Sequence, residues 1–350
     1  MKFNFKEVKN FGMPYIIAEI GANHNGSMDL AKQLIDQAVD AGAHCVKFQS
    51  WTKDSIFSKK VYEDNYFLAD DYRDRIDFTL EEIVDEFSFN QDEFRFLKKY
   101  ADEKKVDFSC TPFSKEEVDF LVDELDIPFI KIASMDLNNL PFLRYIAQKN
   151  KPIVLSTGLS TMAEIETSIR LFEEMGKKDI IILHCVSNYP PKDHDVNLRN
   201  ITMLQNYFQA YAVGFSDHTV GIEIPLASVA LGACMIEKHF TIDKEMFGWD
   251  HKASADYNEL KQIVDGSRRI TAALGSYRRE LNEEDYRRMP AYRRSIVAAN
   301  TIPEGKVIEI DDLDFKRPGT GIEPKHTNFI IGKQAKRTIQ YDELIKMEDF

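Results

Sequence analysis

The chain has 350 residues, of which 43% are hydrophobic, so it can bury a sizeable core. Its net charge of −13 argues against a general nucleic-acid or membrane-surface role, because polyanions would be repelled. Its four cysteines show no CxxC spacing, which predicts reduced thiols rather than a zinc site or disulfides. Because the N-terminus lacks a signal-peptide core and the longest apolar stretch, 224–236, is too short to cross a bilayer, we expect a soluble cytoplasmic protein.

Eight short apolar runs are spread over the first two-thirds of the chain, and each ends at or near a polar residue. They span 15–20, 44–48, 106–110, 128–132, 152–155, 180–186, 212–215 and 233–238. Segments with helical spacing lie between them, the clearest at 27–41, where Ser27 can cap the helix and Gly42 can end it. This alternation predicts a (β/α)8 barrel, in which all the strand ends meet at one rim. An open doubly wound sheet is the rival, but no GxGxxG follows the first strand.

Two regions depart from this alternation. Segment 51–89 is long, acidic and aromatic, and it follows the second strand; a lid or substrate-contacting excursion fits it, and so does a decorative surface insertion. After Gly275 the composition becomes dense in charge, and turn signals then separate short β-like runs. We therefore predict a barrel domain at 1–275, a linker at 276–292 and a small β-rich module at 293–350.

Two histidines form the sharpest constellation in the sequence. His218 follows the seventh predicted strand and His239 ends the eighth, so adjacent barrel strands would bring both imidazoles to one rim. Two neutral imidazoles with open positions suit Mn²⁺, Zn²⁺ or Fe²⁺, and Asp217, Glu237 and Asp250 are near enough in sequence to orient them or complete the shell. Two unrelated hydrogen-bonding histidines are the alternative.

Two lysines stand inside otherwise apolar strands. Lys47 in CVKFQ and Lys131 in FIKIAS would be costly to bury unless they face a polar cavity and meet an anion. Further hydroxyl donors for a phosphate and carboxylate cradle would come from Thr111, Ser134, Ser156 and Ser216. A Schiff base with a carbonyl substrate and purely structural ion pairs are the alternatives for these lysines. Glu19, at the end of the first strand, is a candidate general acid or base.

Ten motifs follow one another through nearly the whole chain: IIAEIGANHNG, AGAHCVKFQ, SCTPFS, FIKIASMDLNNLP, KPIVLSTGLS, LHCVSNYP, VGFSDHT, ALGACMIEKHFT, RRSI and KRPGTGI. Together they resemble the sialic acid synthase family, which comprises N-acetylneuraminate synthase and its relatives. The resemblance implies a (β/α)8 TIM barrel followed by a small β-rich antifreeze-like (SAF) domain, in a domain-swapped homodimer. It also implies condensation of phosphoenolpyruvate with an N-acylated mannosamine-type sugar to give a nine-carbon 2-keto acid and phosphate.

The resemblance assigns roles position by position. His218 and His239 match the family's metal ligands, commonly for Mn²⁺, with Mg²⁺ or Co²⁺ as alternatives. The positions that match its phosphoenolpyruvate-binding residues are Lys47, Thr111, Lys131, Ser134, Ser156, Asn188 and Ser216. Those that match its sugar site are Glu19, Gln49, Tyr189 and Asp250, and Arg317 resembles an arginine that reaches from the partner's SAF domain towards the N-acyl group. The expected catalytic residues are Glu19, His218 and His239.

Departures from the family pattern leave the acceptor sugar open. Met135 and Asp136 stand where many members resemble SGE; we expect Asp136 to contact the sugar, but its side chain is shorter than that of glutamate. N-acetylmannosamine, its 6-phosphate and a 2,4-diacetamido-2,4,6-trideoxy hexose all remain, the last giving legionaminic or pseudaminic acid. A Schiff-base aldolase and a noncatalytic sugar-binding scaffold are competing interpretations of the whole chain.

Overall fold

The computed structural model of the chain describes residues 2–3, 6–66 and 78–350, and it divides into two units, 1–275 and 276–350. Each unit is described by itself. The middle of the acidic, aromatic segment, residues 67–77, lies outside the described residues. Among the described helices, none is both long and apolar enough to span a membrane.

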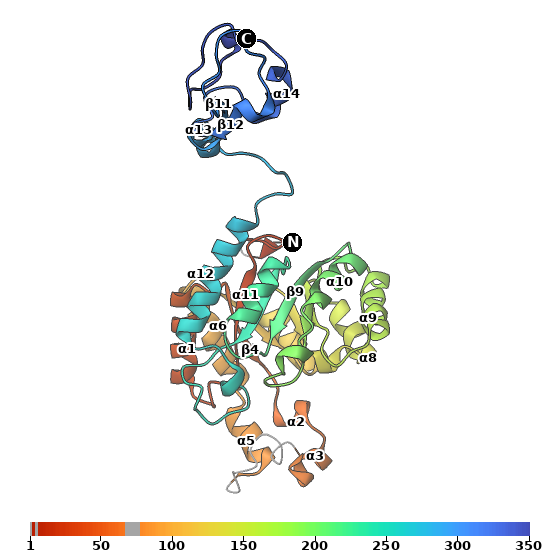
Figure 1. Ribbon diagram of the computed structural model, residues 1–350. Coiled ribbons are helices and arrows are strands. Elements are labelled where there is room, and N and C mark those ends of the chain that lie inside the picture. The colour runs from red at the N-terminus through yellow and green to blue at the C-terminus, as the bar shows by residue number, and fades with distance from the viewer. Residues whose placement is uncertain (1, 4–5, 67–77) are drawn as a thin grey trace. The chain divides into compact units, whose positions relative to one another are not determined.

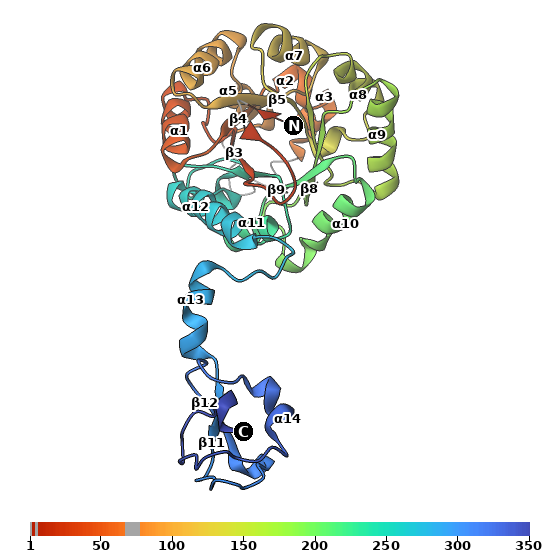
Figure 2. The ribbon, with the colours of Figure 1, turned by 90° about the horizontal axis from the view of Figure 1, so that it is seen from above.

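Eight parallel strands of the first unit curl into a nearly closed barrel, which Figure 1 shows from the side and Figure 2 from above. They are β3 (Tyr15–Gly21), β4 (Cys45–Gln49), β5 (Asp107–Thr111), β6 (Ile130–Ile132), β7 (Ile153–Ser156), β8 (Ile180–Cys185), β9 (Ala212–Asp217) and β10 (Met235–His239). The first and last strands of this set are hydrogen-bonded neighbours, so the sheet is not an open doubly wound one. The predicted (β/α)8 barrel is confirmed.

Helices surround the barrel (Figure 2). They are α1 (Met28–Ala41), α6 (Gln91–Glu103), α7 (Lys115–Asp119), which continues into the π-helix η1 (Phe120–Glu124), α8 (Leu140–Ala147), α9 (Met162–Glu174), α10 (Arg199–Tyr207), α11 (Glu223–Ala230) and α12 (Tyr257–Leu274). As predicted, the Ser27 hydroxyl accepts a hydrogen bond from the Leu30 N–H at the start of α1, and Gly42 ends that helix with φ of 91°.

The opposite end of the barrel from the strand C-termini is closed by a short hairpin. Strand β1 (Lys2–Phe3) pairs antiparallel with β2 (Lys6–Glu7). The Phe3 ring packs 5.3 Å from that of Tyr15 and 5.1 Å from that of Phe129, measured between ring centroids. Aromatic side chains thus plug this end, and the cavity described below lies at the other rim.

The described parts of segment 51–89 carry three helices: α2 (Lys53–Ile56), α3 (Lys59–Asp64) and α5 (Leu80–Phe87). Helix α5 begins with a capping box between Thr79 and Glu82 and buries Leu80, Ile83, Val84 and Phe87. These side chains form a cluster with Trp51, and Trp249 from the loop after β10 packs against it. The segment is thus anchored on the barrel by an apolar core of its own.

The second unit has a small core of its own, dominated by isoleucines that include Ile296, Ile302 and Ile339. Its elements are α13 (Glu283–Tyr292), β11 (Ser295–Ala298), β12 (Leu313–Lys316) and α14 (Thr327–Ile330), with 3-10 turns η5 (Ile310–Asp312), η6 (Pro324–His326) and η7 (Met347–Asp349). Helix α13 lies within the predicted linker. A helix forms there because Asn282 caps its N-terminus and three acidic residues occupy its first turn. The charge-dense composition of this stretch therefore marks an exposed helix as well as a connection.

Inside the barrel wall, strands β9 and β10 are joined by a buried ion pair. Lys238 and Asp217 are register partners, and Lys238 Nζ lies 2.8 Å from Asp217 Oδ2 with both side chains fully buried. Lys238 also donates to the Thr219 carbonyl, while Asp217 Oδ1 accepts from the Thr219 N–H at 2.9 Å. These bonds hold Asp217 and Thr219 in place, and His218 lies between them in the chain.

A Lys238→Met variant should lose about 3–5 kcal/mol of unfolding free energy, because Asp217 would be left as a buried charge without its partner. Lys32→Met is the matched control: its pair with Asp29 is exposed to solvent, so that variant should lose much less unfolding free energy. Urea denaturation of both variants measures the difference. Equal losses would contradict the role given to the buried pair.

Candidate active site

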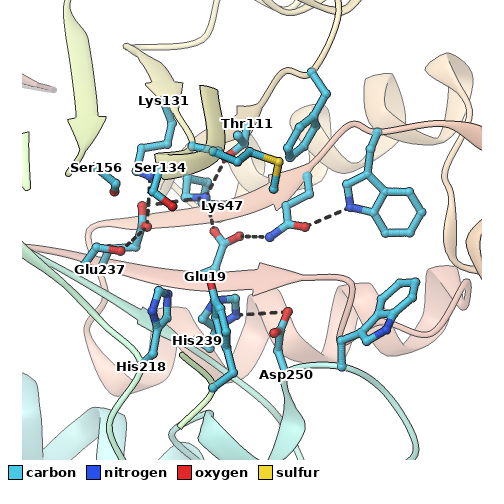
Figure 3. A pocket seen from close by; sticks show the side chains of 18 of the residues that line it. Glu19, Lys47, Thr111, Lys131, Ser134, Ser156, His218, Glu237, His239 and Asp250 are labelled. Atoms are coloured by element: carbon cyan, nitrogen blue, oxygen red, sulfur yellow. Dashed lines mark hydrogen bonds and ion pairs between the residues drawn. The ribbon is translucent and has the colours of Figure 1, made fainter. Parts of the chain in front are cut away.

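A cavity of about 250 Å³ opens at the C-terminal ends of the barrel strands (Figure 3). Of the predicted site residues, twelve line it: Glu19, Lys47, Gln49, Thr111, Lys131, Ser134, Ser156, Tyr189, Ser216, His218, His239 and Asp250. They come from positions more than 200 apart in the sequence, and the barrel brings them to one rim. Three further predicted residues, Asp136, Asn188 and Arg317, do not line it.

Four charged side chains form the floor of the cavity. Lys47 Nζ lies 2.5 Å from Glu19 Oε2 and 3.7 Å from Glu237 Oε2, and Lys131 Nζ lies 3.4 Å from Glu237 Oε1. Strand register explains the first pair, because Glu19 on β3 and Lys47 on β4 are cross-strand partners. The lysines therefore do form ion pairs, but these pairs face a cavity instead of filling the core.

The floor carries an uneven distribution of protons. Burial raises the pKa of Glu19 to about 7, with attraction to Lys47 opposing the shift and repulsion from Glu237 adding to it. Burial also acts to raise the pKa of Glu237, but Lys131 and Lys47 outweigh it and lower this pKa to about 2. Glu237 is thus the permanent counter-ion of the lysines, and Glu19 is the carboxyl that exchanges a proton near neutral pH.

Several hydroxyls lie on or beside the same floor. Lys47 Nζ donates to Thr111 Oγ1 at 2.9 Å, and Ser216 Oγ donates to Glu237 Oε1 at 3.0 Å. Ser134 and Ser187 share a hydrogen bond of 2.8 Å between their hydroxyls. The Ser156 hydroxyl is buried without a hydrogen-bond partner, which is costly unless a bound group supplies one.

The two histidines lie side by side at the cavity wall, with ring centroids 5.3 Å apart (Figure 3). Burial and the neighbouring His239 lower the pKa of His218 to about 4, and burial and Lys47 lower that of His239 to about 3. The Val186 carbonyl lies 2.8 Å from His218 Nδ1 and can only accept, so this nitrogen carries the proton and Nε2 is left with a lone pair. Both rings are neutral at physiological pH.

These imidazoles fit the requirements of metal ligands. His239 Nδ1 is buried without a hydrogen-bond partner, and Asp250 Oδ2 lies 3.6 Å from it. Over the described residues, no group of three or more His, Cys, Asp or Glu side chains is already arranged to hold a metal ion. Two protein nitrogens would therefore leave the remaining coordination positions to water, substrate oxygen or a small movement of Asp250.

Gln49 connects the floor to an aromatic outer part of the cavity. Its Nε2 donates to Glu19 Oε1 at 3.1 Å, and its Oε1 accepts from the indole N–H of Trp51 at 2.9 Å. Tyr189 lies over the histidines, with its ring 4.0 Å from that of His218 and 5.9 Å from that of His239, between centroids. Gln49 and Tyr189 thus stand beside the groups that would meet a carbonyl substrate.

The remaining predicted residues lie elsewhere. Asn188 lines a separate hollow with Thr157 and Ser160. Asp136 is in the 3-10 turn η2 (Ser134–Asp136), where burial raises its pKa and Asn139 donates to it at 3.3 Å. Arg317 belongs to the second unit, where its Nε donates to the Tyr292 carbonyl at 3.1 Å.

Other residues line the cavity although the sequence analysis did not assign them to the site. Glu237 was considered only as a possible partner of the histidines, yet alternation along β10 places it on the same face as His239, and this period is readable from the sequence. The larger omission is apolar, since the cavity is also lined by Trp51, Ile56, Phe57, Val84, Phe113, Ala133, Met135, Cys185 and Trp249. No single motif contains all of these side chains, because they come from several separate segments, and Trp51, Ile56, Phe57, Val84 and Trp249 lie outside every quoted motif.

The fold and the cavity define a (β/α)8-barrel protein whose rim holds buried cations beside neutral imidazoles. Residues 34–279 match the NeuB family, and residues 293–350 match the SAF domain. The chain belongs to the NeuB family, as its motifs predicted. The SAF match covers the small unit with the isoleucine-rich core.

Relatives of known name are similar over nearly the whole chain. The N,N'-diacetyllegionaminic acid synthase of Campylobacter jejuni is 39% identical, over 95% of this chain and 98% of that protein. The N-acetylneuraminate-9-phosphate synthase of Homo sapiens is 35% identical, over 95% and 92%. The crystal structure of the N-acetylneuraminic acid synthetase of Leptospira borgpetersenii matches with a TM-score of 0.72 and 33% identity, over 82% of this chain and 94% of that chain.

The raised pKa of Glu19 predicts how stability depends on pH. In the folded protein this pKa is about 7 instead of 4.5, so folding favours the protonated form. The contribution of Glu19 to stability is therefore complete below pH 4.5 and is lost as the pH rises through about 7. As the pH rises from 4.5 to about 7, a Glu19→Gln variant should gain unfolding free energy relative to the native chain. Urea denaturation of both proteins at these two pH values measures the difference. A difference that stays constant with pH would contradict the raised pKa.

Proposed function

We propose that the chain joins phosphoenolpyruvate to an N-acylated mannosamine-type hexose, giving a nine-carbon 2-keto acid and inorganic phosphate. The observation that carries this proposal is a single cavity in which two buried lysines face two neutral imidazoles. The first group suits an anion and the second a polarised carbonyl. Membership of the NeuB family and the synthases among its relatives support the same reaction class.

The floor supplies what phosphoenolpyruvate requires. Lys47 and Lys131 provide two positive charges for its phosphate and carboxylate, and the unpartnered Ser156 hydroxyl provides a donor. Glu237 balances one of the lysine charges because its pKa is about 2. When Glu19 is protonated the four-residue floor keeps a net positive charge, so an anion is attracted to it.

The imidazoles of His218 and His239 are the groups that would hold a divalent cation, which we propose to be Mn²⁺, with Mg²⁺ or Co²⁺ as alternatives. Such a cation would supply Lewis-acid polarisation of the aldehyde of the open-chain sugar. Asp250 lies beside His239 and would orient that imidazole, as carboxylates near ligating histidines do. The Tyr189 ring lies against that of His218 at a tilt of 37° and would restrict the space in which the aldehyde can lie.

The reaction needs three proton transfers. A new bond forms between C3 of phosphoenolpyruvate and the aldehyde carbon, and the aldehyde oxygen takes up a proton. Water then adds at C2 and loses one proton; when the bond from C2 to the phosphate oxygen breaks, the remaining hydroxyl proton passes to the departing phosphate, leaving the keto group. Glu19 is the proposed proton carrier, because a pKa of about 7 allows both of its forms at neutral pH.

Phosphate release from phosphoenolpyruvate tests this proposal. The full chain with Mn²⁺ would be offered N-acetylmannosamine, its 6-phosphate and the diacetamido-trideoxy hexoses in parallel, with and without EDTA. We expect release with at least one acceptor, abolished by EDTA, and a loss of about 100-fold or more in kcat for His218→Ala and His239→Ala, as removal of an electrostatic stabiliser predicts. EDTA-insensitive turnover with borohydride trapping of a keto acid on Lys131 would instead indicate a Schiff-base aldolase.

We also propose a domain-swapped homodimer in which Arg317 reaches the partner's sugar site. Among the described residues, the lining of the cavity contains no arginine, so a guanidinium for the N-acyl group must come from elsewhere. Arg317 is exposed on its own unit, with its guanidinium 5.2 Å from the centroid of the Tyr292 ring. We place the protein in the cytoplasm, since its four cysteines are free thiols.

Complementation tests the swap. Arg317→Ala and His218→Ala should each be nearly inactive alone, but co-expression should restore part of the activity, because one site of the mixed dimer would combine an intact barrel with an intact Arg317. Light scattering after size exclusion should give the mass of a dimer. A monomer, or a mixture that stays inactive, would contradict the proposal and detach Arg317 from the site.

A further inference from the structure

Six apolar side chains form one part of the cavity lining, here called the outer wall: Trp51, Ile56, Phe57, Val84, Phe113 and Trp249. Four of them belong to segment 51–89, and the others come from the loops after β5 and β10. Substrate contact by the described part of this segment is therefore favoured over a decorative role, since it supplies cavity surface. Neither the phosphoenolpyruvate floor nor the proton transfers use these side chains.

Hydrogen bonds place the outer wall relative to the floor. Lys131 contacts Glu237, which contacts Lys47, and Lys47 contacts Glu19. From Glu19 the series continues through Gln49 to the indole of Trp51, which packs 5.9 Å from the Trp249 ring between centroids. The outer wall thus lies at the end of the cavity remote from Lys131.

This order fixes the direction of the acceptor. In the proposed reaction, the aldehyde carbon of the acceptor lies beside the imidazoles and against C3 of the phosphoenolpyruvate bound on the floor. The rest of the open chain then extends past Gln49 and Glu19 towards the outer wall. The carbons remote from the aldehyde, C6 above all, are the ones that meet the aromatic side chains.

The outer wall offers nothing that would bind a charged group. In the part of the chain that the structure describes, Lys47 and Lys131 are the only lysine or arginine side chains in the lining, and both face carboxylates on the floor. Residues 51–66 and 78–89, the part of this segment that the structure describes, have seven acidic side chains against three basic ones, so their field at the cavity mouth is negative. A phosphate at C6 would lose water there without gaining a cation, which is costly.

The outer wall is also held in place before any ligand binds. Val84 is fully buried, and Phe87 packs 6.1 Å from the Trp249 ring between centroids. The indole N–H of Trp51 is already committed to Gln49. A surface fixed in this way is preorganised for an apolar group and cannot readily turn a polar atom towards a hydroxyl or phosphate.

We infer that the outer wall selects an acceptor whose remote end is uncharged and deoxygenated, namely a 6-deoxy N-acylated hexose, over a 6-hydroxy or 6-phosphorylated one. The inference rests on the proposed function and specifies its substrate class. Among the acceptors considered, the 2,4-diacetamido-2,4,6-trideoxy hexoses have this chemistry. Their C6 methyl group would lie against Trp51, Phe57 or Trp249.

The acceptor series tests the inference through kcat/KM. With Mn²⁺ and saturating phosphoenolpyruvate, the best diacetamido-trideoxy hexose should exceed N-acetylmannosamine by about 10-fold or more, which is what one apolar group is worth in a hydrophobic pocket. The 6-phosphate should be the poorest acceptor. Equal values, or a preference for the 6-phosphate, would overturn the inference and leave the condensation reaction standing. Absence of phosphate release with every acceptor would instead overturn both the proposed function and the inference.

Two variants test whether the outer wall causes the selection. Trp249→Leu should raise the KM for the deoxy acceptor about 10-fold while kcat and the KM for phosphoenolpyruvate stay the same, because the contact acts before and during the chemical step alike. Phe57→Arg should lower kcat/KM for the deoxy acceptor and raise it for the 6-phosphate. Phe96→Arg is the matched control, since Phe96 is 49% exposed on α6 and outside the lining.

Circular dichroism would establish that each variant is folded. If Phe57→Arg fails to fold, Trp249→Leu and the native acceptor series still decide the matter. A Phe57→Arg variant that keeps the native order of acceptors, or a Trp249→Leu variant in which only kcat falls, would contradict selection by the outer wall.

Discussion

The buried contact of Lys47 and Lys131 with Glu19 and Glu237 is the interaction on which the site depends. Two ammonium groups inside a barrel would be prohibitively costly alone, and two carboxylates make them tolerable. The carboxylates do not fully neutralise the two lysine charges. Glu237 stays ionised, whereas burial raises the pKa of Glu19 to about 7. The floor can therefore take up a proton and become positive when an anion arrives.

The barrel makes this arrangement possible because its register aligns the charges. Glu19 is the cross-strand partner of both Lys47 and His239, so one carboxyl borders the anion site and the imidazole pair. Alternation along β10 turns Glu237 and His239 to the cavity and leaves Lys238 to the buried pair with Asp217 that steadies the His218 loop. The reaction is a proposal, whereas strand register and the buried ion pair directly account for the positions of these side chains.

The barrel and most of the floor could be predicted from the sequence, because buried parallel strands are continuous apolar runs and a lysine within one stands out. The family and the fold are confirmed; the metal and the dimer stay predictions. The outer wall could be anticipated only in so far as segment 51–89 was a candidate for substrate contact, because Phe113 and Trp249 come from separate loops and look like ordinary core residues. Asn188 was expected in the cavity from its motif, and motif position alone could not show that it lines a neighbouring hollow.

Proton uptake on binding phosphoenolpyruvate is the most direct measurement of the central claim. The uptake is measured by calorimetric titration in buffers of different ionisation enthalpy. At about pH 8 the phosphate of the ligand is already fully ionised, since the second pKa of such a phosphate is about 6. The added negative charge should raise the pKa of Glu19 further, so the native protein should take up nearly one proton and a Glu19→Gln variant none. Absence of uptake, or the same uptake in the variant, would contradict the account of the floor.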